Sequence, residues 1–338
     1  KGINVDWVVK YNIGEDSTCE DANIELAEEG CELIFNNSYG FEPFMLKVAP
    51  DYPEIQFVGC TNQGSWNDGL ENTHNAFANI YEGRYVAGVA AGLATCGKVP
   101  FVVTYAVFGS LRMCEMIRQE VCYPNLNVKF ACSHGGVTPA NDGASHQSIE
   151  DMGVLRTIPN MTVIMPADYN AARKLVRQAA ETYGPMYLRF TRDAVSQIYD
   201  EDVEFTIGKA HTIQDGKDVA IIANGDTVRL AIEAARELAG KGISARVLDM
   251  HTIKPLDVEA GTAAVNDIGK IITVEDHNIL NGLGSAVCEV AAEMGKGIVK
   301  RVGIQDQFGQ SAPYERLLAI NGVTVEHIVE LAQELARK

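Results

Sequence analysis

The sequence lacks several features, each of which would indicate a particular class of protein. No run of about 18 apolar residues occurs, so no segment is expected to span a membrane. Only 28 Lys and Arg stand against 45 Asp and Glu, and a net charge of -17 repels phosphate backbones, so nucleic acid is not an expected partner. The 8 cysteines include no CxxC pair, which argues against zinc and iron–sulfur sites. We expect a globular protein with free thiols in a reducing cytoplasm.

The first 90 residues differ in character from the rest. They begin KGINVDWVVK, without a charged start, apolar stretch and cleavage site, so export of the sequence as written is not expected. They carry 4 basic and 15 acidic residues, whereas the remainder carries 24 and 30. This uneven acidity suggests that segments of two origins meet near residue 90.

Short apolar strands alternate with helical patterns along the chain. Strands are expected at residues 6–13, 32–36, 55–60, 101–104, 128–133, 161–165, 186–190, 219–224, 244–250, 270–276 and 300–304. Helices are expected at residues 21–29, 44–48, 71–94, 110–121, 171–183, 227–239, 258–266, 285–293 and from 324 to the end. The alternation predicts an α/β fold with parallel sheets covered by helices. Weaker periodicity over residues 194–217 indicates a domain boundary near 200–215.

Several strings carry a family resemblance: GLATCGKVPFVVTYAVF, CYPNLNVKFACSHGGVTPANDGASHQ, YLRFTR, MHTIKPLD, VEDHNILNGLGSAV and VGIQDQFGQS. With these strings in this order, residues 92–338 resemble the C-terminal half of transketolase, or the separate C-terminal subunit of a split transketolase. The resemblance implies a truncated pyrimidine-binding domain over residues 92–205 and a transketolase C-terminal domain over 210–338.

The resemblance also implies an activity and its partners. The family transfers a two-carbon ketol unit between sugar phosphates, a reaction of the pentose phosphate pathway. Its cofactor is thiamine diphosphate, which would be shared with a partner chain that binds the metal, Mg or Ca. The expected partners are therefore an N-terminal, diphosphate-binding subunit and a second copy of this chain, paired through the pyrimidine-binding and C-terminal domains.

Six residues match the family's functional positions. Tyr105 and Phe108 match the aromatic slot of the cofactor's aminopyrimidine ring, which favours stacking in an apolar pocket. Arg192 matches the arginine that binds the sugar phosphate, a role that suits a guanidinium fork. The other three lie in the SHGGVTPANDGASHQ loop and are implied as catalytic: His134, Asp142 and His146.

The loop chemistry suits these implied roles. Imidazole can donate, accept or transfer a proton near neutral pH, so His134 and His146 are expected to contact substrate or cofactor. Asp142 matches the residue that recognises a donor hydroxyl. Residues 140–143 read ANDG where the family usually has GEDG, so one acid is missing. The string NDG does not predict a metal site, and NGLGSAV at 281–287 lacks the third glycine of a dinucleotide-binding turn.

The first segment resembles a different family. ELAEEGCELIFNNSYGFEPFMLKVAPDYPEIQFVGCTNQ and NTHNAFANIYEGRYVAGVAAG are similar to basic-membrane-protein (BMP) substrate-binding lipoproteins, which bind nucleosides for ABC importers. This implies a partial periplasmic-binding-protein-like βαβ segment over residues 1–91, with the SYGF loop (38–41) at a ligand mouth. Sites of this family form between two lobes, so half a lobe should bind little. Because both resemblances meet at GVAAGLA, we interpret the chain as a fusion.

The fusion has expected structural consequences. The family's catalytic glutamate lies in a GIAEQ-type string, whereas this chain reads IYEGRYVAGVAAG, with Glu82 one residue too far upstream. We expect strand 55–60 to pair with strand 101–104 under one helix over 71–94, so that Glu82 cannot reach the pyrimidine slot. We also expect residues from about 215 to fold as an independent domain.

Other interpretations stay open at the level of sequence. The chain could be a BMP-type nucleoside-binding module, which a nucleoside titration would reveal, or a non-functional chimera. TIKPLD and GLGSAV also occur in deoxyxylulose-phosphate synthase and in the beta subunit of 2-oxoacid dehydrogenases, other thiamine-diphosphate enzymes. CYPNLNVK and the histidine loop favour transketolase.

Overall fold

The computed structural model describes residues 8–10, 13–36, 39–59, 69–75 and 80–337, and for residues 39, 75 and 80–85 it describes the backbone alone. The chain divides into two compact units, Lys1–Glu82 and Gly83–Lys338. Within the described ranges, no helix is long and apolar enough to cross a membrane.

A parallel three-stranded sheet organises the first unit. Its strands are β1 (Leu33–Asn36), β2 (Gln56–Gly59) and β3 (Thr73–Asn75), in the order β1-β2-β3. Helix α1 (Ser17–Glu28) begins after Asp16, whose side chain accepts from the Thr18 N–H, and α2 (Glu42–Val48) follows β1. The core holds Ile34, Met45 and Phe57. The expected strands at 32–36 and 55–60 and helices at 21–29 and 44–48 are confirmed.

Two expectations about the first segment are wrong. The helix expected over residues 71–94 is instead β3 followed by α3 (Ile80–Thr95). The predicted pairing of β2 with strand 101–104 does not form, because β1 and β3 occupy both edges of β2. The segment thus supplies its own third strand from residues that read as helical. The strand expected at 6–13 lies largely outside the described residues, as does Ser38 of SYGF.

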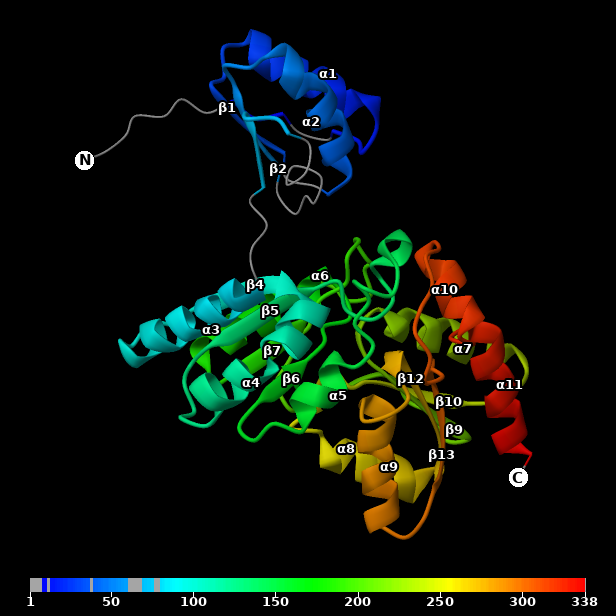
Figure 1. Ribbon diagram of the computed structural model, residues 1–338. Helices are drawn as coiled ribbons and strands as arrows, with labels where there is room; N and C mark the ends of the chain where they lie inside the picture. Colours follow the sequence, from blue (N-terminus) through cyan, green and yellow to red (C-terminus); the bar gives the residue numbers. More distant parts are fainter. Residues whose placement is uncertain (1–7, 11–12, 37–38, 60–68, 76–79, 338) are drawn as a thin grey trace. The chain divides into compact units, whose positions relative to one another are not determined.

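A five-stranded sheet forms one half of the second unit (Figure 1). Its order is β11-β6-β7-β5-β4, with β4 (Phe101–Tyr105), β5 (Lys129–Ser133), β6 (Thr162–Ile164), β7 (Met186–Arg189) and β11 (Thr252–Lys254). The helical segments around it are 108–112, α4 (Cys114–Met116), 117–122, α5 (Asp151–Arg156) and α6 (Tyr169–Glu181). Strand β4 forms the edge, where Val103 is 74% exposed.

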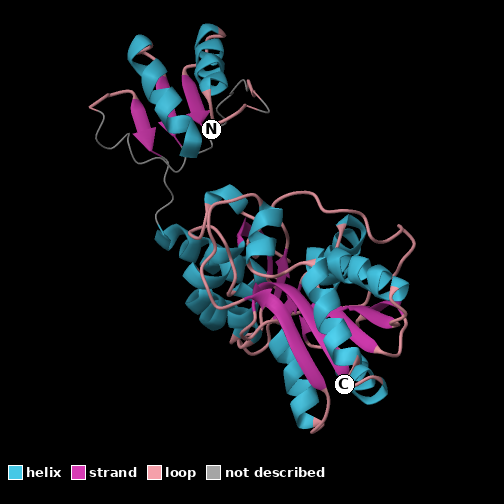
Figure 2. Ribbon diagram, turned by 90° about the vertical axis from the view of Figure 1, so that its right-hand side faces the viewer, coloured by secondary structure: helices cyan, strands magenta, loops and turns pink. Residues whose placement is uncertain are grey.

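A second five-stranded sheet has the order β13-β12-β9-β10-β8. Its strands are β8 (His211–Gln214), β9 (Val219–Ala223), β10 (Ala245–Asp249), β12 (Lys270–Asn278) and β13 (Ile298–Ile304). Its helices are α7 (Val228–Gly240), α8 (Val258–Asp267), α9 (Leu283–Glu293), α10 (Tyr314–Ile320) and α11 (Val325–Ala336). Figure 2 shows helices on both sides of these strands, as the sequence predicted. Antiparallel β8 and β11 were not predicted.

The two sheets share their hydrophobic cores. Along β9, Val219, Ile221 and Ala223 face the core that contains α7 and α11, whereas Ala220 and Ile222 face the core that contains α8 and α9. Both cores continue into the first sheet, which contributes residues of β7 to each. Strand β11 also crosses over to pair with β6. These contacts argue against our expectation that residues from about 215 fold on their own.

Candidate active site

The candidate site lies where the parallel strands β4 and β5 end. Tyr105 is the last residue of β4 and is paired with Ser133 of β5, and His134 follows directly. Carboxyl ends of neighbouring parallel strands share one edge of a sheet, so the two rings meet there. The ring centroids of Tyr105 and His134 lie 3.9 Å apart, with 11° between the planes.

Two more predicted residues join this ring cluster. The Phe108 ring lies almost parallel to that of Tyr105, at 5.8 Å and 5°. His146 meets both rings edge-on, at 6.0 Å from Tyr105 and 5.5 Å from Phe108. The Arg112 guanidinium covers Phe108 at 4.3 Å, a cation–π contact that the sequence did not suggest. The structure thus brings together Tyr105, Phe108, His134 and His146.

The electrostatics of His134 keep its ring neutral. Burial, and then the positive charge of Arg192, lower the pKa of His134 below its ordinary value. Its Nδ1 lies 2.8 Å from the Ser133 hydroxyl. His146 makes the same kind of contact, with its Nδ1 2.9 Å from the Ser145 hydroxyl. Both imidazoles are therefore oriented by the serine that precedes them, and a neutral His134 can accept or donate at its other nitrogen.

The remaining two predicted residues form an ion pair. The Arg192 guanidinium lies 3.0 Å from the Asp142 carboxylate and also donates to the Pro139 carbonyl at 2.8 Å. Side-chain exposures of 38% and 35% leave both groups partly open to solvent and to a ligand. The pair joins the end of β7 to the histidine loop and presents an anion-binding and a hydroxyl-binding group side by side.

The departure from the family's GEDG string has a structural correlate at Ala140. Its φ of +55° lies in the left-handed region, which favours glycine. We predict that Ala140→Gly raises the free energy of unfolding by about 0.5–1 kcal/mol, because it relieves this strain. The matched control is Ala172→Gly in the interior of α6, which should lower the same quantity by about 1 kcal/mol. Urea unfolding measures both, and the same sign for the two variants would contradict the prediction.

A cluster of buried charges beneath the loop was missed by sequence reasoning. Arg189, at the end of β7, is fully buried; its Nε donates to Asp151 at 2.8 Å and its Nη2 to the Ser148 carbonyl at 2.8 Å. The Tyr187 hydroxyl donates to the same Asp151 oxygen at 2.6 Å, and burial raises the pKa of Tyr187. The available signal was an arginine flanked by apolar residues inside the predicted strand of YLRFTR.

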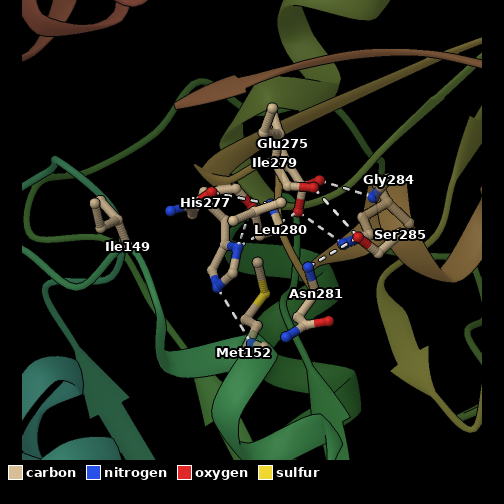
Figure 3. A network of polar contacts seen from close by, with 12 residues as sticks. Ile149, Met152, Glu275, His277, Ile279, Leu280, Asn281, Gly284 and Ser285 are labelled. Atoms are coloured by element: carbon tan, nitrogen blue, oxygen red, sulfur yellow. Dashed lines mark hydrogen bonds and ion pairs between the residues drawn. The ribbon is translucent and has the colours of Figure 1, made fainter. Parts of the chain in front are cut away.

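The VEDHN string ends β12 with buried hydrogen-bond acceptors (Figure 3). The Glu275 carboxylate accepts from the Leu283 and Gly284 N–H groups, both at 2.7 Å, where α9 begins. Burial raises the pKa of Glu275 to about 7. A carboxylate thus occupies the position at which a phosphate would bind a helix N-terminus. This agrees with the sequence of the turn, NGLGSAV, which lacks the third glycine of a dinucleotide-binding turn.

His277 on the same strand joins β12 to α5. Its Nε2 accepts from the Gly153 N–H at 3.2 Å, and its Nδ1 lies 2.7 Å from the Asn278 carbonyl oxygen. Burial lowers the pKa of His277 to about 4, so its ring is neutral and Nδ1 carries the proton. The contact links the second sheet to the helix that follows the histidine loop.

Comparison with known proteins bears on this geometry. Family models match residues 74–197 (transketolase, pyrimidine binding domain), 208–328 (transketolase, C-terminal domain) and 1–122 (ABC transporter substrate-binding protein PnrA-like). A Methanocaldococcus jannaschii protein provisionally described as a transketolase C-terminal section is 43% identical over 254 residues, 74% of this chain and 79% of the relative. The chain belongs to the transketolase family.

Some relatives of this transketolase-family chain are described as separate subunits. One subunit of the apulose-4-phosphate transketolase of Phocaeicola vulgatus is 41% identical over 74% of this chain and 80% of its own length. A solved structure described as a split gene transketolase, inactive beta4 tetramer, is 36% identical with a TM-score of 0.71, covering 94% of this chain and 96% of its own. The family uses thiamine diphosphate. Because several of these relatives are subunits of split enzymes, their organisation implies a partner subunit for this chain. Both predicted resemblances, to transketolase and to the BMP family, are confirmed.

The ring cluster of this transketolase-family chain fits part of the cofactor. Tyr105 and Phe108 are half-buried aromatic side chains, and a planar heteroaromatic ring favours stacking against such side chains. Among the residues that the structure describes, no group of three or more His, Cys, Asp or Glu could hold a metal ion. Glu82 lies in α3, but its side chain is outside the described residues, so its distance from the slot stays a prediction.

Proposed function

We propose that this chain is the pyrimidine- and sugar-binding half of a composite enzyme that transfers a two-carbon ketol unit between sugar phosphates. The observation that carries the proposal is the ring cluster at the ends of β4 and β5, beside the Asp142–Arg192 pair. The proposed domains are residues 1–91, 92–205 and 210–338, and the proposed compartment is the cytoplasm.

Each side chain has a role in this proposal. Tyr105 and Phe108 stack against the pyrimidine ring of thiamine diphosphate, which when bound supplies a nucleophilic carbon to the donor ketose. His134 and His146 bind the sugar and hold or move a proton at its oxygen atoms. Asp142 accepts a hydrogen bond from a hydroxyl group of the donor sugar. Arg192 binds the phosphate, and its ion pair with Asp142 orients both groups before the sugar arrives.

A partner completes the site. We propose that a diphosphate-binding subunit holds the metal, Mg or Ca, and the diphosphate, and that two copies of this chain pair through the pyrimidine-binding and C-terminal domains. We further propose that the BMP-like first segment impairs catalysis, because it replaces the stretch that carries the family's catalytic glutamate.

A segment exchange tests the proposed function. Residues 1–91 are replaced by the matching segment of a split transketolase C-terminal subunit, and the product is mixed with a diphosphate-binding subunit, thiamine diphosphate and magnesium. We expect transfer of two-carbon units from a ketose phosphate to an aldose phosphate, followed by coupled assay. A folded, assembled complex that transfers nothing would refute the proposal.

Arg192 gives a sharper prediction in the same complex. We expect Arg192→Ala to raise KM for the sugar phosphate roughly tenfold or more, since one charge-assisted phosphate contact is lost. The control is Arg118→Ala, whose guanidinium contacts only the neighbouring Gln119 side chain among the contacts described, and which should leave KM unchanged. Equal KM values for the two variants would exclude phosphate binding by Arg192.

A further inference from the structure

Asp276 joins the second sheet to the histidine loop. It lies on β12 and is fully buried, yet both of its carboxylate oxygens accept from the Val137 N–H, at 3.1 and 3.0 Å. Val137 lies three residues after His134. A side chain from one sheet therefore bonds directly to the loop that carries the ring cluster at the edge of the other.

The backbone between His134 and Val137 has little freedom to shift. A Cβ added to Gly136, which has a φ of +63°, would collide with the Asp276 carboxylate. A Cβ added to Gly135 would collide with the Arg189 guanidinium. Gly136 also exchanges backbone hydrogen bonds with Ser148, both at 2.8 Å. The two glycines of SHGG thus let the main chain pack directly against the buried side chains of Arg189 and Asp276.

Asp276 is itself held in place from two sides. Its backbone carbonyl accepts from Arg189 Nη2 at 2.9 Å, and its Oδ2 lies 3.3 Å from the Tyr314 hydroxyl, which also donates to Asp226. An acceptor that is fixed this firmly can impose a position on the N–H group that it binds.

We propose that Asp276 is a positioning residue: by fixing the main chain at Gly136 and Val137, it sets the ring of His134 against Tyr105. This inference rests on the proposed function for the importance of His134. The test of this inference needs neither a partner subunit nor catalytic turnover. The positioning role of Asp276 and the proposed function can therefore fail separately.

The test uses NMR spectroscopy on the full chain with three variants. Burial and the charge of Asp226 raise the pKa of Asp276 to about 7, so exchange of the Val137 amide is measured at pH 8. In Asp276→Ala, exchange should accelerate roughly tenfold or more, because a charge-assisted hydrogen bond is lost. The pKa of His134 should rise toward its ordinary value as the loop admits water. Asp276→Asn keeps an acceptor oxygen and should show a smaller acceleration in the same direction.

Glu275→Ala is the matched control. It removes an equally buried carboxylate from the adjacent position of β12, but one that bonds to α9 and not to the loop. It should leave Val137 exchange and the His134 titration unchanged. Wild-type behaviour in a folded Asp276→Ala variant, or equal effects of Glu275→Ala, would overturn the proposal. If Asp276→Ala does not fold, Asp276→Asn decides, and unchanged Val137 exchange in it overturns the proposal.

Discussion

A polypeptide of these 338 residues, supplied with thiamine diphosphate and magnesium alone, is expected to show no ketol transfer. Some relatives are separate subunits of a composite transketolase, and we propose that the groups that bind the diphosphate and its metal belong to the other subunit. Adding a diphosphate-binding subunit should leave the rate about 10²–10⁴-fold below that of the segment-exchanged chain, the usual contribution of one acid–base group. The coupled assay for sugar phosphates measures both rates.

Glu82 provides the control for this expectation. Glu82→Gln should leave any residual rate unchanged, since we expect this carboxylate to lie outside the pyrimidine slot. Turnover by the chain without a partner would contradict the composite site. Loss of a measurable residual rate in Glu82→Gln would show that Glu82 has taken the place of the missing catalytic glutamate.

The largest expected effect on stability belongs to Arg189. Its guanidinium bonds to the fully buried Asp151 and to two backbone carbonyl oxygens, those of Ser148 and Asp276. Arg189→Met keeps much of the length of the side chain but leaves the Asp151 carboxylate without its buried counter-charge. We expect the free energy of unfolding to fall by about 3–5 kcal/mol. Urea unfolding followed by far-ultraviolet circular dichroism measures this change.

Arg246→Met is the matched comparison. Its guanidinium also bonds to two carboxylates, but those of Asp215 and Asp267 are 78% and 53% exposed. Water screens such pairs, so the loss should stay below about 1 kcal/mol. In Arg189→Met combined with Asp151→Asn, part of the stability should return, because the unpaired charge is removed as well. Similar losses for the two single variants would contradict the role of burial.

The sequence could predict those parts of the site that depend on neighbouring parallel strands. Tyr105 and His134 lie at the ends of two strands with clear apolar patterns, so their meeting follows from the topology. Asp276 and Arg189 were not identified as site residues, because a charged residue in a strand looks solvated until the pairing of strands and the packing of loops bury it. Their bonds to Val137 and Ser148 join positions that sequence distance does not relate.

The errors in the fold have a similar cause. Strand β3 is only three residues long, THN, and has no apolar alternation; its extended form comes from pairing with β2. Strand β11 is equally short and forms by pairing with β6. Longer strands such as β9 and β12 were predicted because each carries enough apolar residues to indicate burial on both faces.

Strand β11 comes from the C-terminal part of the chain but pairs with β6, and this has a consequence for a chain cleaved by a protease. Residues 194–210 contain no helix or strand and include exposed positions, so a protease can cleave there. The carboxyl-terminal piece would still contribute β11 to the sheet of the amino-terminal piece and would share both cores with it. A nicked second unit should therefore migrate as one particle in native gel filtration and separate into two fragments only in denaturant.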